Sequence, residues 1–181
     1  ANVAFSTDIV EIGGCTEPER FDTLLHETAE AKDSVGGMVE CRVQGVPAGL
    51  GDPYFDSAES VIAQLLFAIP GVKGVEFGSG FAGAQMRGSE HNDPIVDAAG
   101  HTATNHAGGI AGGLTNGNEL VVRAAFKPTA SIGRPQNTYN RMTEQVEPLI
   151  LAGRHDVCIA LRGAVVVEAA VAIALADLLH R

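Results

Sequence analysis

The pattern of apolar and polar residues along the chain predicts two amphipathic helices in its first half. Residues 15–33 contain the capping-box pair Thr16 and Glu19, and apolar side chains then recur at helical spacing. We therefore expect an exposed acidic helix in this segment. Residues 57–69 carry a second apolar stripe, which Pro70 should end because proline cannot continue a helix.

The last segment, residues 163–180, predicts a helix that is apolar almost all round. Glu168 and Asp177 lie nine residues apart, about 180° around a helix, so they do not form one polar face. Such a helix is usually covered on several sides. With two acids in the 17 residues 163–179, the stretch is expected to be too short and too charged to span a membrane.

The remaining periodic segments predict strands and one more helix. Strands are expected at residues 36–45, 72–78 and 155–161, and a β-hairpin around Asn116-Gly117 within residues 108–126. Residues 142–153 predict a helix, whereas residues 80–109 and 133–140 show no sustained period. Because strands and helices do not alternate strictly, the fold class is α+β, an antiparallel sheet with hydrophobic helices packed against it. We expect a single domain over residues 1–181.

Composition and charge narrow the classes of function. Apolar residues make up 45% of the 181 residues, as in globular proteins. The net charge of −10 argues against nucleic acid or an anionic membrane as a partner. Three cysteines without CxxC spacing favour reduced thiols and a cytoplasmic location. The charge is uneven, since residues 1–60 sum to −9 and residues 121–162 to +3.

This basic excess surrounds a candidate phosphate site. Lys127 ends an apolar run and is followed by the hydroxyls of Thr129 and Ser131, donors suited to an anion. Arg154 and Asp156 would face the same way on a strand, as an anion clamp with an adjacent proton acceptor or as a plain salt bridge.

Two other segments leave their chemistry open. Four glycines within residues 108–113 allow close approach of a ligand, or equally serve a tight sheet crossing. His101 and His106 are five residues apart, a spacing that matches neither HExxH nor a zinc finger, so no metal site is predicted. There is also no nucleophile elbow and no Ser-His-Asp order.

Six ordered motifs add a resemblance that covers essentially the whole chain. They are "DSVGGMVECRVQGVPAGLGDPYFD", "AIPGVKGVEFGSGF", "MRGSEHND", "NHAGGIAGGLTNG", "FKPTASIGRPQNT" and "GRHDVC". Together they resemble the C-terminal half of the chorismate synthase family. The resemblance implies half of a β-α-β sandwich-like fold, a homotetramer, and the 1,4-anti elimination of phosphate from 5-enolpyruvylshikimate 3-phosphate with reduced FMN.

The resemblance also implies roles for individual residues. Asp156 matches an aspartate that handles a proton near flavin N5, and Arg154 matches an arginine at the flavin and substrate phosphate. Asn105 and His106 would support the site. The cofactor-binding positions implied are Pro70, Gly71, Gly112, Lys127, Pro128, Thr129, Ala130, Ser131 and Arg154.

The family's two catalytic histidines and its arginine- and serine-rich segment belong to an N-terminal half that precedes the motifs found here. We therefore expect this chain to be a fragment with an incomplete active site and little activity alone. The alternatives are a non-catalytic module that binds flavin or phosphate, and a purely structural interaction domain.

Overall fold

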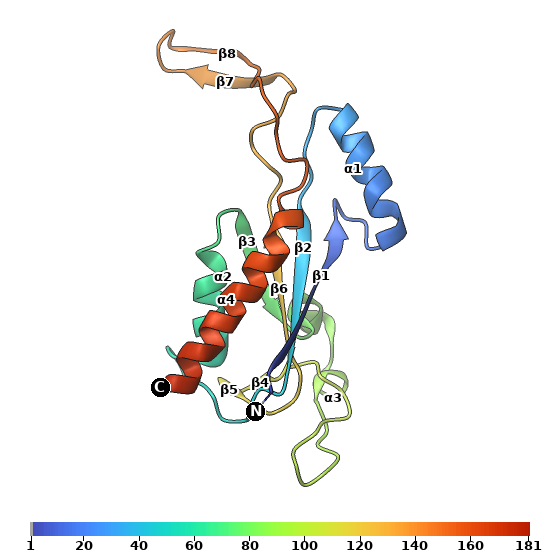
Figure 1. Cartoon of the computed structure of the whole chain (residues 1–181), viewed down its shortest axis with the longest axis vertical. Helices are drawn as coiled ribbons and strands as arrows, with labels where there is room; N and C mark the ends of the chain where they lie inside the picture. The colour runs from blue at the N-terminus through green and yellow to red at the C-terminus, as the bar shows by residue number, and fades with distance from the viewer. Residues whose placement is uncertain (1) are drawn as a thin grey trace.

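The computed structural model describes residues 2–181, and its main sheet has four antiparallel strands in the order β1-β2-β6-β3 (Figure 1). Two small two-stranded sheets, β4-β5 and β7-β8, lie outside it. The strands are β1 Ala4–Ile12, β2 Gly37–Gln44, β3 Val72–Phe77, β4 Ile110–Ala111, β5 Leu114–Thr115, β6 Leu120–Phe126, β7 Gln136–Asn140 and β8 Gln145–Leu149. The predicted α+β class with an antiparallel sheet is confirmed.

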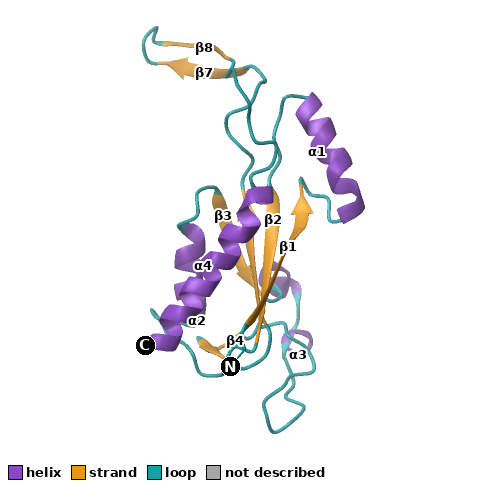
Figure 2. Cartoon of the chain, in the orientation of Figure 1, coloured by secondary structure: helices purple, strands orange, loops and turns teal. Residues whose placement is uncertain are grey.

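Two helices cover one face of the main sheet (Figure 2). They are α2 and α4, which also pack against each other, whereas α1 lies beside the end of β1. The helices are η1 Pro18–Arg20, α1 Phe21–Glu30, α2 Ala58–Phe67, η2 Gly80–Gln85, α3 Gly88–His91 and α4 Ala160–His180. The helices predicted in residues 15–33, 57–69 and 163–180 are thus confirmed, but Thr16 and Glu19 do not form a cap, because α1 begins later, at Phe21 after a 3-10 turn.

The core lies between the sheet and these two helices. The alternate residues Val39, Cys41 and Val43 of β2 are fully buried and face the helices, as their spacing predicts. Leu66 of α2 and Val167 of α4 are likewise fully buried. Burial of each large aliphatic side chain stabilises the fold by about 1.5–3 kcal/mol, so this layer is the main source of stability.

The opposite face of the sheet carries a charged network across three strands. Glu40 accepts hydrogen bonds from Arg42 Nε at 2.7 Å and from Arg123 Nε at 2.6 Å. Arg123 also donates to Glu76 at 3.1 Å, and Arg42 to Glu119 at 2.8 Å. Burial alone would lower the pKa of Arg123, but the hydrogen bonds to Glu76 and Glu40 raise it. Arg123 therefore stays charged.

Helix α4 spans 21 residues and is long and apolar enough, by length and composition, to cross a membrane. The expectation that this segment is too short is therefore wrong, because the helix extends beyond both ends of residues 163–179. One side of α4, including Val167 and Val171, is buried on the sheet. Its opposite side is open, with Val165 71% exposed and Ile173 60% exposed. Within this chain α4 is covered by the sheet and by α2, while its opposite side is open.

The predicted hairpin around Asn116-Gly117 is wrong. The turn forms at Gly112-Gly113, which joins β4 to β5, while β6 belongs to the main sheet. Both glycines have positive φ, +62° and +88°, as tight hairpin turns require. The Asn116 side chain accepts a hydrogen bond from the backbone N–H of Asn118 instead, so it forms a local turn.

The helix predicted for residues 142–153 is also wrong, because residues 145–149 of this segment form β8, which pairs with β7 in a two-stranded ribbon. Val146, Leu149 and Ile150 imitate helical spacing, but Pro148 lies among them and disfavours a helix. The strand predicted for residues 155–161 is absent, since this segment is a loop followed by the start of α4.

Candidate functional site

A groove of about 440 Å³ lies where β6 ends, between the segments before β3 and after β6. Phe126 is the last residue of β6, and the Lys127 N–H donates to the Gly71 carbonyl at 2.9 Å. This bond holds the Pro70-Gly71 turn against the strand end. Six of the residues predicted to bind a cofactor line the groove together: Pro70, Gly71, Lys127, Pro128, Thr129 and Ala130.

Six further lining residues were not predicted: Ile69, Phe126, Ile159, Arg162, Gly163 and Val166. Gly71 has φ +92°, and a side chain there would come within 2.5 Å of Ile159 Cδ1. A Cβ on Gly163 would come within 2.5 Å of Phe126 Cζ. The two glycines therefore let α4 approach the strand end closely. Gly163, the first residue of the predicted apolar helix, was the available sequence signal for this wall.

The groove has few polar side chains. Lys127 is exposed and makes no ion pair within residues 2–181. Thr129 Oγ1 is buried without a hydrogen-bond partner among the described residues, although the Thr129 carbonyl accepts from Ser34 Oγ at 2.7 Å. A buried hydroxyl without a hydrogen-bond partner lowers stability by about 1–3 kcal/mol. A ligand that formed a hydrogen bond with this hydroxyl would therefore bind more tightly.

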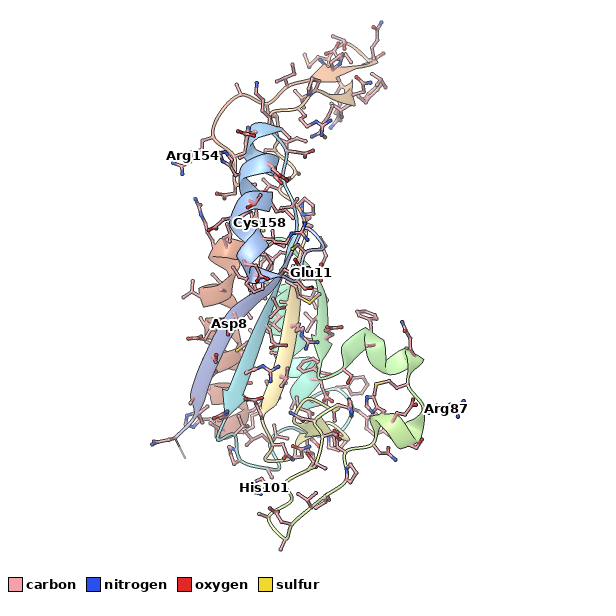
Figure 3. The ribbon with its side chains drawn as sticks, turned by 90° about the vertical axis from the view of Figure 1, so that its right-hand side faces the viewer. Asp8, Glu11, Arg87, His101, Arg154 and Cys158 are labelled. Atoms are coloured by element: carbon pink, nitrogen blue, oxygen red, sulfur yellow. The ribbon has the colours of Figure 1, made fainter. Side chains whose placement is uncertain are left out.

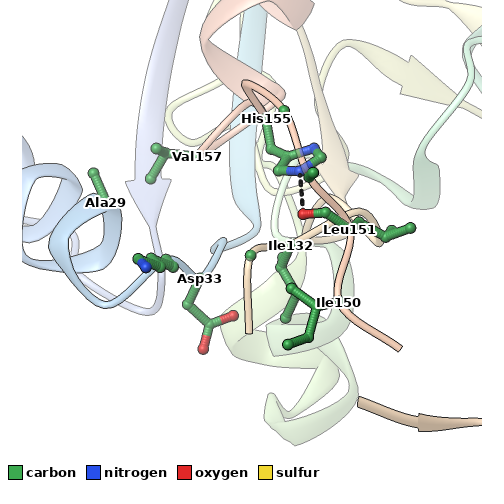
Figure 4. A pocket seen from close by; sticks show the side chains of 11 residues that line it. Ala29, Asp33, Ile132, Ile150, Leu151, His155 and Val157 are labelled. Atoms are coloured by element: carbon green, nitrogen blue, oxygen red, sulfur yellow. Dashed lines mark hydrogen bonds between the residues drawn. The ribbon is translucent and has the colours of Figure 1, made fainter. Parts of the chain in front are cut away.

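A second cavity of about 430 Å³ lies farther along the segment that follows β6, at Ile132 and Gly133 (Figure 4). It is lined by Ile132, His155 and Val157, and by Asp33 near the end of α1. Asp33 accepts hydrogen bonds from the Ser34 N–H at 2.9 Å and from Arg134 at 2.7 Å. These bonds, the backbone one first, lower the pKa of Asp33.

The other predicted site residues near the end of β6, Ser131, Arg154 and Asp156, do not line the groove. Ser131 connects Ala130 of the groove to Ile132 of the second cavity. Arg154 is exposed on a loop beside the upper end of α1 (Figure 3), and Asp156 pairs with Arg162 at 3.0 Å rather than with Arg154. The expected shared strand is missing, so the two residues are held by a loop.

Gly112 lies away from the groove. It sits in the β4-β5 turn, beyond the start of β6, whereas the groove lies at the end of that strand (Figure 1). A seven-residue strand is about 20 Å long. Within one chain the structure does not bring Gly112 to the Lys127 segment.

The sequence profile described as chorismate synthase matches residues 6–180. This chain belongs to the chorismate synthase family. It is 54% identical over 175 residues to the chorismate synthase of Chitinophaga pinensis, an alignment that covers 97% of this chain and 52% of that protein. It is 52% identical over 147 residues to the chorismate synthase of Opitutus terrae, covering 80% of this chain and 40% of the relative.

A solved structure described as the crystal structure of chorismate synthase superposes with a TM-score of 0.79 at 27% sequence identity. The match covers 98% of this chain and 56% of the solved one. The chain thus spans about half the length of the chorismate synthases that it matches. The likeness extends over nearly all the residues that form the groove.

The long segment before β4, which has little regular structure, is organised by one carboxylate in this family member. Asp93 accepts hydrogen bonds from the N–H groups of His106 at 2.8 Å and Ala107 at 2.9 Å, and from the Thr104 hydroxyl at 2.7 Å. His106 Nδ1 lies 2.7 Å from Ser79 Oγ. The two predicted supporting residues therefore have structural contacts, since Asn105 also donates to the Glu119 carbonyl at 2.8 Å.

The Asp93 contacts predict a pH-dependent stability. Burial alone would raise the pKa of Asp93, but the hydrogen bonds from Ala107, Thr104 and His106 lower it below the usual value. A carboxyl with a lowered pKa in the folded state contributes stability above its unfolded pKa and loses it as pH falls through the folded pKa. Asp93→Asn should therefore lower the free energy of unfolding by about 1 kcal/mol at pH 7. The difference in unfolding free energy from wild type should shrink in acid, below roughly pH 4.

Urea unfolding of both proteins at several pH values measures this difference. Asp52→Asn is the control, because Asp52 is exposed and should show no such change. A constant deficit of Asp93→Asn from pH 7 into acid would contradict the role given to the ionised carboxylate.

Proposed function

We propose that this chain supplies one half of a cytoplasmic, homotetrameric chorismate synthase. Its reaction would be the 1,4-anti elimination of phosphate from 5-enolpyruvylshikimate 3-phosphate to give chorismate, with reduced FMN as cofactor and no net redox change. The observation that carries the proposal is the groove at the end of β6, where six residues meet that the family resemblance assigns to the cofactor.

The residues present fit a flavin phosphate cofactor. The groove volume of about 440 Å³ is within the usual range for small-molecule sites, roughly 300–1,000 Å³. Lys127 offers a cation, and the unpartnered Thr129 hydroxyl offers a donor, to a phosphate group. Phe126 and the Pro70-Gly71 turn provide an apolar wall for a planar ring. When bound, reduced FMN would lend electron density to the cleavage of the C–O bond.

The chain's own residues would orient the substrate and handle charge and a proton. Arg154 would bind the departing phosphate, since a guanidinium matches phosphate geometry and stabilises the developing charge. Asp156 would accept a proton as a carboxylate. Arg162, 3.0 Å from Asp156 and lining the groove, would hold that carboxylate in place.

The rest of the site would come from the half of the protein that this chain does not match. The open side of α4, with Val165 and Ile173, supports this arrangement, because a β-α-β sandwich places a further layer against such helices. Catalytic histidines and an arginine- and serine-rich segment would come from that layer, as the family resemblance implies.

A complementation assay tests the proposal. The purified chain is mixed with substrate and reduced FMN under anaerobic conditions, with and without the part of the Chitinophaga pinensis enzyme that it does not cover. We expect no chorismate from the chain alone and chorismate from the mixture, followed by its ultraviolet absorbance. Turnover by the chain alone at the rate of a full-length enzyme would refute the division of the site.

The second candidate is a module that binds FMN without chemistry. It is favoured by the fact that the groove is built entirely from this chain. Saturable FMN binding by the chain, with no turnover in any mixture that contains the complementary half, would support this alternative. Absence of both binding and turnover would remove both candidates.

A further inference from the structure

Residues 32–36, which join α1 to β2, contact both segments that carry the predicted site residues. One segment, residues 127–134, follows β6, and the other, residues 153–158, precedes α4. Neither segment belongs to a helix or a strand, so no ladder of backbone hydrogen bonds fixes its position. We call residues 32–36 the clasp, because its contacts hold the two segments.

The end of α1 directs the chain into the clasp. The Lys32 N–H donates to the Ala29 carbonyl at 3.0 Å, and the Asp33 N–H donates to the Thr28 carbonyl at 3.1 Å. These are the two hydrogen bonds of a Schellman motif, which reverses the chain at a helix end. Lys32 has φ +56°, a left-handed conformation that usually takes glycine. The turn therefore leads the chain away from α1 and toward the site.

Two hydrogen bonds join the clasp to the segment after β6. The Ser34 hydroxyl donates to the Thr129 carbonyl at 2.7 Å, and the Gly133 N–H donates to the Lys32 carbonyl at 3.0 Å. Because the peptide group is planar, holding the Thr129 carbonyl restricts the backbone at Thr129 and so the direction of its side chain. That side chain carries the buried hydroxyl that has no partner among residues 2–181.

Asp33 orients Ser34 and extends the same connection. One oxygen of its carboxylate accepts from the Ser34 N–H at 2.9 Å, and the other accepts from Arg134 at 2.7 Å. The carboxylate therefore fixes the backbone of the residue that holds Thr129. It also holds the end of the segment after β6.

Gly36 brings the clasp against the groove itself. A Cβ on Gly36 would come within 2.6 Å of the Phe126 carbonyl oxygen and 3.4 Å of Pro128 Cδ. Both Phe126 and Pro128 line the groove. A residue with a side chain at this position would push the clasp away from the groove wall.

The other contacts of the clasp hold the loop before α4. The Val35 N–H donates to the Val157 carbonyl at 2.9 Å, and the Cys158 thiol donates to the Gly36 carbonyl at 3.6 Å. Val157 directly follows Asp156 in the chain. The clasp therefore sets the spacing between this loop and the segment after β6.

We propose that Ser34, oriented by Asp33, is a positioning residue for the cofactor. It holds the peptide of Thr129 so that the Thr129 hydroxyl faces the bound FMN, while Val35 keeps the loop of Asp156 at a fixed distance. Neither Ser34 nor Asp33 lines the groove, so both act through the residues that they hold. This inference rests on the proposed function, since it gives Ser34 a role in a site that binds FMN.

Titration of flavin fluorescence with the chain tests the role of Ser34. Ser34→Ala should weaken FMN binding by about five- to tenfold, the value of one hydrogen bond. Ser34→Thr keeps the hydroxyl and should bind within about twofold of wild type. Thr28→Ala is the matched control, because the Thr28 hydroxyl donates to the Leu24 carbonyl at the same 2.7 Å but lies away from the groove. It should leave the FMN affinity unchanged.

A double-mutant cycle separates positioning from a general effect on the fold. In a Thr129→Val background the hydroxyl that Ser34 positions is gone, so adding Ser34→Ala should weaken FMN binding by less than about twofold. An equal loss of affinity in both backgrounds would show that Ser34 acts without Thr129, and would overturn the proposal.

Hydrogen exchange tests the clasp without any ligand. The amides of Val35 and Gly133 donate its two backbone hydrogen bonds to the site segments, so both should exchange faster in Asp33→Ala than in wild type. The Thr115 amide, which donates to the Leu50 carbonyl at 2.9 Å, is the internal control and should not change. Unchanged exchange at Val35 and Gly133 would overturn the clasp.

Failure of the inference and failure of the proposed function give different results. If the wild-type chain does not bind FMN, the proposed cofactor groove is wrong, and the positioning role is wrong with it. If wild type binds FMN and Ser34→Ala binds it equally tightly, the groove stands and the role of Ser34 alone is overturned.

Discussion

Replacing Glu40 with alanine should lower the free energy of unfolding by about 2–3 kcal/mol. Glu40 is 8% exposed and neutralises two guanidinium groups, those of Arg42 and Arg123. Removing one partner of a buried ion pair costs about 3–5 kcal/mol, and the partial exposure of both arginines reduces this amount. Urea unfolding followed by circular dichroism measures the change.

Glu119→Ala provides the matched comparison, because Glu119 pairs with Arg42 at a more exposed place in the same network. Glu119→Ala should lower the free energy of unfolding by less than about 1 kcal/mol. The double variant Glu40→Ala/Arg123→Ala should lose less unfolding free energy than the sum of the losses in the two single variants, since it leaves one fewer cation unpaired. Equal costs for Glu40→Ala and Glu119→Ala would mean that burial does not strengthen this network.

The second large effect is expected on cofactor affinity. If the groove holds FMN, Lys127→Ala should weaken FMN binding by about 10–100-fold, because a hydrogen bond to a charged group is worth about 1.5–3 kcal/mol. Quenching of flavin fluorescence on titration with the chain measures this affinity.

Two other lysines serve as controls for this titration. Lys73 is exposed at the neighbouring strand β3 but does not line the groove, so Lys73→Ala should bind FMN as wild type does. Lys32 lines the second cavity, together with Ile132 and Gly133. A large loss with Lys32→Ala and none with Lys127→Ala would move the cofactor site to that cavity.

The spacing of apolar residues predicted the helices and strands that bury one face in the core. The alternation in β2 and the stripes of α1, α2 and α4 each match a face that packs on the core. In β1 the same alternation is present, with Phe5, Thr7 and Ile9 partly buried, but it is interrupted by a bulge between Ile9 and Glu11. We predicted no element there, because the strand lies at the edge of the sheet and its apolar residues are weakly marked.

The errors at residues 108–126 and 142–153 have a common physical cause. In both segments, a local sequence pattern favoured one structure, whereas contacts elsewhere in the fold stabilise another. Asn116-Gly117 is a strong hairpin dipeptide, yet the neighbouring Gly112-Gly113 pair closes the hairpin. Val146 and Leu149 have helical spacing, yet they pair across a ribbon with Tyr139 and Gln136.

The candidate site was predictable only where its residues lie within family motifs. The family motifs identified Pro70-Gly71 and the segment from Lys127 to Ala130, which are distant in sequence and meet in one groove. Arg162 and Gly163 were missed, because their approach depends on how α4 crosses the end of β6. No sequence pattern encodes that crossing.

The position of β6 has a consequence for how the chain reaches its native state. Among residues 2–181, the strand that pairs with β3 is β6, and β2 pairs with β6 across the 75 intervening residues 45–119. During synthesis, β1 and β2 can form a hairpin early, but β3 waits until residue 126 has left the ribosome. Non-local pairings of this kind slow folding, so the unprotected edges of β2 and β3 are the surfaces on which a chaperone would act.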